Sequence, residues 1–169
     1  YRLLALLFAA AVVADNLQIP DGWQLVGVSN PDDEVKFTLA LKQQNLGHLK
    51  TLHDERSDPD NLLYRVWLTH AQINEIISPE AEELAKVTHF LAGAALVECG
   101  VEESSACYEV LGDAIRVHTT VKTTEELFGV GMKAYKHTST NKVFNRFEAN
   151  VVLPPDVAGV VEFVECIVG

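Results

Sequence analysis

The feature that most constrains this chain is a change of hydrophobic period within residues 35–59. In residues 35–42, apolar side chains alternate with polar or small ones, and the apolar positions are Val35, Phe37, Leu39 and Leu41. Successive side chains of a strand point to opposite faces, so this alternation of β-branched, aromatic and aliphatic residues predicts a half-buried strand.

After Asn45 the apolar spacing becomes helical. The residues that share one helical face are Leu46, Leu49, Leu52 and His53. We expect Asn45 to cap the first turn through its side-chain oxygen. Ser57-Asp58-Pro59 should end the helix, because proline disfavours the α conformation of the residue before it. The stretch therefore predicts a strand that runs directly into an amphipathic helix, and we expect the rest of the chain to cover this unit.

The same stretch carries a family resemblance. Its motifs, with others up- and downstream, are Pro20-Asp21-Gly22-Trp23, Leu41-Lys42-Gln43-Gln44-Asn45-Leu46, Ser57-Asp58-Pro59, Tyr64, Leu68-Thr69, Ser78-Pro79 and Leu153-Pro154. In this order, over roughly residues 20–165, they resemble the pro-kumamolisin-type activation prodomain of the sedolisin and tripeptidyl peptidase I family of serine-carboxyl peptidases. Arg65 follows Tyr64 where the family usually has a glycine.

The fold expected from the order of elements is α+β. Further strands are expected at residues 113–119, 132–137 and 142–147, and further helices at 70–77, 78–93 and 121–128. Thr69 and Ser78 are the expected N-caps, and Trp23 is expected to anchor an extended lead-in to the core. Two strand–helix units that share one antiparallel sheet suggest a ferredoxin-like fold with two main helices. The resemblance implies the same fold with added short helices.

The charge of the chain limits its partners. Its 24 Asp and Glu outnumber its 13 Lys and Arg, which gives a formal net charge of −11. A nucleic-acid-binding surface needs clustered basic residues, so nucleic acid is not an expected partner.

Residues 3–14 form an unbroken apolar run, LLALLFAAAVVA. The run is too short for a membrane-spanning helix, which needs about 20 residues, but it suits the apolar part of a secretory signal. Cleavage is then expected between Ala14 and Asp15, and the missing initiator Met indicates a truncated start. A buried core helix is the alternative. A signal peptide predicts the secretory route, with an extracellular or a lysosomal or vacuolar destination.

Cys99 and Cys107 flank a short acidic loop. A secreted chain favours oxidation, and the spacing does not suit a zinc site. The resemblance also implies a disulfide at this place. Cys166 is then left over, as a free thiol or as a partner for a cysteine outside this chain.

A search for catalytic motifs is negative. Ser29 is followed by Asn30 and Pro31, so Gly27-Val28-Ser29 is no nucleophile elbow, and the sequence has no phosphate-binding loop and no metal motif. The resemblance implies a catalytic Ser-Glu-Asp triad in a separate domain, and its Ser-Gly-Thr-Ser motif is absent here. We therefore expect no catalytic residue, metal or cofactor in this chain, although its parent precursor would be an endopeptidase or tripeptidyl peptidase.

The six histidines are not spaced as metal ligands, and we interpret each as a surface or rim residue. They are His48, His53, His70, His89, His118 and His137. As a set they could still respond to acid, since imidazoles gain charge as the pH falls through about 6.5.

One face of the predicted sheet is a candidate docking surface. The side chains opposite the apolar face are Lys36, Thr38, Ala40, Arg116 and His118. Two of them are small, which would let a partner helix lie flat. An ordinary solvated face is the alternative.

These predictions divide the chain into a signal-peptide remnant (1–14), an extended lead-in (15–33), an activation prodomain (34–165) and the start of a linker (166–169) to a catalytic domain that is absent here. The expected function is that of a propeptide that chaperones and inhibits its own acid-acting peptidase until acid releases it. A free-standing secreted inhibitor of similar shape and an unrelated secreted binding module are the alternatives.

Overall fold

The computed structural model describes residues 19, 21–100 and 106–167, without the side chains of 166 and 167. The predicted signal peptide, with Ala14 and Asp15, lies outside these residues. The strands are β1 (Trp23–Val28), β2 (Glu34–Leu41), β3 (Val97–Glu98), β4 (Cys107–Val110), β5 (Ala114–Thr120), β6 (Met132–His137), β7 (Val143–Phe147) and β8 (Val161–Ile167). The helices are α1 (Leu46–Ser57), α2 (His70–Ile77), α3 (Ala81–Ala92), α4 (Val121–Phe128) and α5 (Pro155–Ala158).

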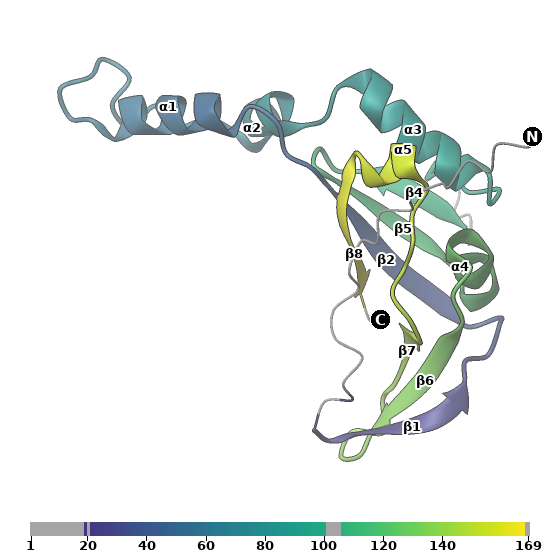
Figure 1. Cartoon of the computed structure of the whole chain (residues 1–169). Coiled ribbons are helices and arrows are strands. Elements are labelled where there is room, and N and C mark those ends of the chain that lie inside the picture. The colour runs from purple at the N-terminus through teal and green to yellow at the C-terminus, as the bar shows by residue number, and fades with distance from the viewer. Residues whose placement is uncertain (1–18, 20, 101–105, 168–169) are drawn as a thin grey trace, which may run out of the picture.

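The main sheet has the ferredoxin-like topology. Its strand order is β3-β4-β5-β2-β8, with antiparallel pairing except between β3 and β4 (Figure 1). In chain order β2, α3, β4, β5, α4 and β8 form the β-α-β-β-α-β unit of that fold. The predicted α+β class is confirmed.

Two insertions elaborate this unit. One is the α1–α2 segment between β2 and α3. The other is a separate three-stranded sheet, β1-β6-β7, whereas β2 and β5, the strands of the two predicted strand–helix units, share the main sheet as expected. Trp23 does not anchor β1 to the main core. Its ring packs within the small sheet, 4.8 Å from the ring of His137 and 4.6 Å from that of Phe144, measured between centroids.

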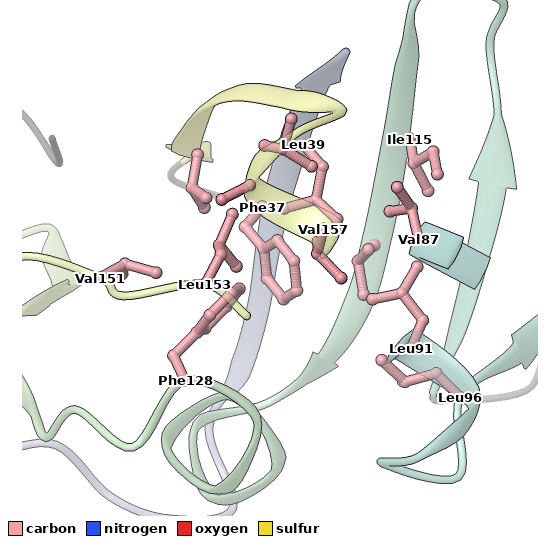
Figure 2. Packing of buried hydrophobic residues seen from close by; sticks show 14 of the residues in the cluster. Phe37, Leu39, Val87, Leu91, Leu96, Ile115, Phe128, Val151, Leu153 and Val157 are labelled. Carbon is pink, nitrogen blue, oxygen red and sulfur yellow. The ribbon is translucent and has the colours of Figure 1, made fainter. Parts of the chain in front are cut away.

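The core lies between the main sheet and helices α3, α4 and α5 (Figure 2). The alternation of β2 and β5 buries Phe37, Leu39, Ile115 and Val117 completely. The helices contribute buried side chains at Val87, Leu91, Val121, Phe128, Val157 and Ala158. The ring of Phe128 stands edge-on to that of Phe37, with 5.2 Å between the centroids.

Helix α1 does not cover the sheet, contrary to the prediction. None of its residues is buried, and Leu49 and Leu52 are only half-buried. Asn45 occupies the N-cap position with φ 52° and makes no capping hydrogen bond. Its side-chain Nδ2 instead donates to the carbonyl oxygen of Ile76 at 3.1 Å. The helix therefore leaves the sheet and packs on α2, and α3 takes its predicted place over the core.

Of the two N-caps predicted for the helices after α1, Thr69 is confirmed and Ser78 is wrong. Thr69 caps α2 in a reciprocal capping box with Gln72, as expected. Ser78 does not begin α3: its N–H closes α2 by donating to the Asn74 carbonyl oxygen at 2.9 Å. Helix α3 begins at Ala81, with Glu80 at the N-cap position.

A disulfide joins Cys99 to Cys107, with 4.9 Å between their Cα atoms. It fastens the short parallel pair of β3 and β4 at the edge of the main sheet. Cys166 lies in β8, where the register sets it opposite Phe37.

Candidate docking surface

The face of the main sheet opposite α3 and α4 brings the predicted docking residues together. The strand register places Lys36 beside His118 and Thr38 beside Arg116. Lys36 and Arg116 are exposed, while Thr38, Ala40 and His118 are half-buried. We call this surface the open face.

Further residues of the open face were not predicted, among them the exposed Glu34 of β2. Phe163 and Glu165 of β8 pair with Ala40 and Thr38, and Glu109 of β4 pairs with Arg116. The side chain of Phe163 is 45% exposed, which places an aromatic surface next to the small Ala40. The Glu109 carboxylate lies 3.5 Å from the Arg116 guanidinium.

A bulge explains why sequence reasoning missed β8. The register shifts between Ala40 and Leu41, so Val161 pairs with Leu41 and Phe163 with Ala40. The extra residue, Glu162, breaks the period-2 pattern that announces a strand. The signal that remains is the buried pair Val161 and Val164 at the end of the apolar tail.

The open face is nearly balanced in charge, unlike the whole chain. Lys36 and Arg116 oppose Glu34, Glu109 and Glu165. Its centre is small and uncharged, formed by Thr38 and Ala40. The hydroxyl of Thr38 is buried and makes no hydrogen bond in the described part of the chain. A flat partner surface could therefore approach the backbone closely at Thr38 and Ala40, with Arg116 and Glu165 on either side of Thr38.

The structure groups no His, Cys, Asp or Glu side chains into a metal site within the residues it describes. In the same residues, no helix has the length and apolar content that crossing a bilayer requires.

The family model for the pro-kumamolisin activation domain matches residues 21–168. The chain belongs to this family. The activation domain is also similar to physarolisin from Physarum polycephalum, with 26% identity over 96% of this chain and 27% of the relative. It resembles tripeptidyl-peptidase 1 from Rattus norvegicus, with 36% identity over 48% of the chain and 14% of that protein.

A third relative is tripeptidyl-peptidase SED1 from Arthroderma otae, 27% identical over 84% of this chain and 22% of its own length. The activation domain thus spans about a quarter or less of the curated relatives that it matches.

Proposed function

We propose that this chain is the propeptide of a serine peptidase precursor of the sedolisin and tripeptidyl peptidase type. In this role it helps the downstream catalytic domain to fold and then inhibits it in cis until acid pH. The family match over residues 21–168 is the observation that carries the proposal. The names of the matched relatives, which are tripeptidyl-peptidases and physarolisin, support a peptidase as the partner.

The open face is the proposed contact with the catalytic domain. Inhibition needs a preformed surface that a folded partner can cover without rearrangement, and a sheet supplies one. The small centre at Thr38 and Ala40 would admit a helix of the partner, while Lys36, Arg116, Glu109 and Glu165 would set its orientation. The chain then leaves the sheet through β8, next to β2, and would continue toward the catalytic cleft.

Acid release follows from the charges on the same face. As the pH falls from 7 toward 4, histidine side chains gain charge and carboxylates begin to lose theirs. A surface that carries basic side chains beside carboxylates, as the open face does, then becomes more positive. Partner groups that pair with carboxylates of this chain would lose some of those pairs, and the complex would weaken.

A signal peptide at residues 1–14 would send the precursor into the secretory pathway, with a secreted, lysosomal or vacuolar destination. The Cys99–Cys107 disulfide supports this route, because disulfides persist in oxidising compartments.

The test uses the chain and the mature peptidase isolated from its full-length precursor. The chain should inhibit the peptidase at pH 7, raise the yield of active enzyme when the unfolded catalytic domain is refolded, and bind progressively more weakly toward pH 4 at fixed ionic strength. A dissociation constant that stays flat between pH 7 and 4 would remove acid release and leave an inhibitor that must be digested. A failure both to inhibit and to assist refolding would refute the propeptide role.

A further inference from the structure

The α1–α2 insertion, residues 46–77, forms an arm that ends in exposed apolar side chains. The connecting loop carries Leu62, Leu63, Tyr64, Val66 and Trp67, all of which are exposed. Leu62 is 100% exposed and Trp67 is 57% exposed. A cluster of this kind at the end of a projection favours contact with another surface.

The arm tip is held in a defined conformation. The carboxylate of Asp58 accepts the N–H of Asp60 at 3.0 Å, and the side-chain oxygen of Asn61 accepts the N–H of Leu63 at 2.9 Å. These are Asx turns, which fix the backbone through a short polar side chain. The N–H of Arg65 donates to the Arg56 carbonyl oxygen at 2.9 Å and ties the loop to α1. An ordered tip loses little conformational entropy when it binds.

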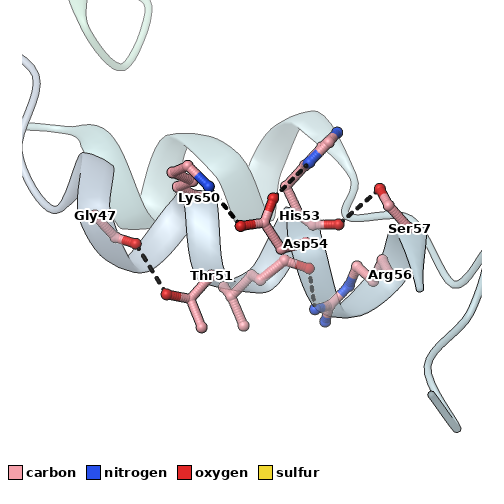
Figure 3. A network of polar contacts seen from close by, with 8 residues as sticks. Gly47, Lys50, Thr51, His53, Asp54, Arg56 and Ser57 are labelled. Carbon is pink, nitrogen blue, oxygen red and sulfur yellow. Dashed lines mark hydrogen bonds and ion pairs between the residues drawn. The ribbon is translucent and has the colours of Figure 1, made fainter. Parts of the chain in front are cut away.

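The shaft of the arm is stabilised locally (Figure 3). Lys50 pairs with Asp54 one turn later, and the hydroxyls of Thr51 and Ser57 donate to the carbonyl oxygens of Gly47 and His53. The hydrogen bond from Lys50 lowers the pKa of Asp54 below its usual value. Helix α1 thus combines these local contacts with its packing on α2, without any residue in the main core.

At the base of the arm, the residues that lead into α1 are hydrogen-bonded to the last residues of α2. The N–H of Gln44 donates to the Ile77 carbonyl oxygen at 2.9 Å, and the Asn45 amide donates to that of Ile76. The 12 residues of α1 extend about 18 Å from this base at about 1.5 Å per residue. The arm thus places its apolar tip at a set distance from the sheet.

The direction of the arm relates it to the open face. In Figure 1, α3 and α4 lie on one side of β2 and β8, and the arm extends toward the other side. It leaves the main sheet at Leu41, the end of β2. Strand β8 ends at Ile167, which pairs with Lys36 near the start of β2, so the chain exits at the opposite end of the sheet. A domain seated on the open face would lie between the arm and the exit of the chain.

We propose that the arm tip is a second docking site for the catalytic domain of the same precursor, separate from the open face. This rests on the proposed function. The matched relatives are about four to seven times longer than the region that this chain matches, so their length leaves room for such a domain. Asp58 and Asp60 beside the tip and the exposed Arg65 within it indicate that the receiving surface is an apolar depression with charged groups of both signs at its rim.

The first test compares substitutions in trans inhibition of the mature peptidase at pH 7. Trp67→Ala and Leu62→Asp should each raise the inhibition constant on the order of tenfold, mainly through faster dissociation. Val28→Asp is the matched control, because Val28 is 81% exposed but lies on β1 in the other sheet. All three variants should keep the wild-type circular dichroism and melting temperature. Unchanged inhibition by both tip variants, with normal inhibition by the wild type, would overturn the arm proposal alone.

The second test works even if the chain does not inhibit in trans. Leu62 is replaced by p-benzoylphenylalanine in the full-length precursor, with Val28 replaced in a parallel control, and both are irradiated. A crosslink from position 62 to the catalytic domain, but none from position 28, supports the proposal. Crosslinks only to a second copy of the precursor, or none at all, overturn it.

Discussion

The ammonium of Lys42 donates hydrogen bonds to the carbonyl oxygens of Gly159 at 2.9 Å and of Ala158 at 3.0 Å. Lys42 directly follows β2 at the base of the arm, and the two carbonyls close α5 before β8 begins. The last carbonyls of a helix have no partner within it, so a cation there is favourable. The contact joins the start of the arm to the segment that leads out of the domain.

Lys42→Met should therefore lower the free energy of unfolding by about 1 kcal/mol, because it keeps the apolar stem and removes the charged donor. Lys50→Met is the matched control, since its pair with Asp54 lies on the exposed surface and contributes little to stability. Urea denaturation of both variants checks the difference. Equal small effects would show that the Lys42 contact is only an exposed ion–dipole contact without structural weight.

Substitutions of Leu39, in the core, and of Leu52, in the arm, should have different effects on stability. Leu39 is 0% exposed between the main sheet and its helices, so Leu39→Ala should cost roughly 2–5 kcal/mol. Leu52 is half-buried within the arm, so Leu52→Ala should lower the free energy of unfolding by only about 1 kcal/mol. Equal large losses in urea denaturation would mean that α1 covers the sheet after all.

The sequence predicted the strands β2 and β5 better than it predicted which helix covers them and which strands lie beside them. The alternation in residues 35–41 and 114–119 identified both strands and the residues of each face. The spacing of Leu46, Leu49 and Leu52 could not show whether their helix covers a sheet or stands away from it, because that depends on the competing, more apolar α3. Glu109, Phe163 and Glu165 were missed at the docking surface because β4 is short and a bulge interrupts β8.

Arg65 and Gly129 both have a left-handed backbone conformation, so substitutions there should have opposite effects on stability. Arg65 has φ 60°, and Gly129 has φ 65° after the end of α4. A side chain costs roughly 1 kcal/mol in this conformation. Arg65→Gly should leave stability unchanged or raise it, whereas Gly129→Ala should lower it by about 1 kcal/mol although its Cβ would meet no neighbour within 4 Å. Melting temperatures that shift in the same direction would contradict this account of the two turns.

The domain itself should tolerate mild acid. The Lys50 hydrogen bond lowers the pKa of Asp54, so its stabilisation is present above the unfolded pKa and is lost only as the pH falls below about 4. The hydrogen bond to Glu83 raises the pKa of Lys86, so that contribution is lost only as the pH rises through the alkaline range. Neither group weakens the fold between pH 7 and 5.

Over the same interval the excess negative charge of the chain declines, which reduces its self-repulsion. The melting temperature should therefore stay level, within about 2 °C, or rise between pH 7 and 5. Calorimetry in buffers of equal ionic strength checks this. A fall of more than about 4 °C would show that acid acts by unfolding the domain rather than by changing its docking surface.

The most direct test of the account concerns Ala40, at the centre of the open face. Ala40→Arg should weaken inhibition of the mature peptidase at pH 7 by at least about tenfold, because a long charged side chain would hold the partner away from the sheet. Ala149→Arg is the matched control, as Ala149 is exposed outside the main sheet, and circular dichroism must show both variants folded. The account predicts a raised inhibition constant for Ala40→Arg alone; wild-type inhibition by a folded Ala40→Arg variant would contradict it.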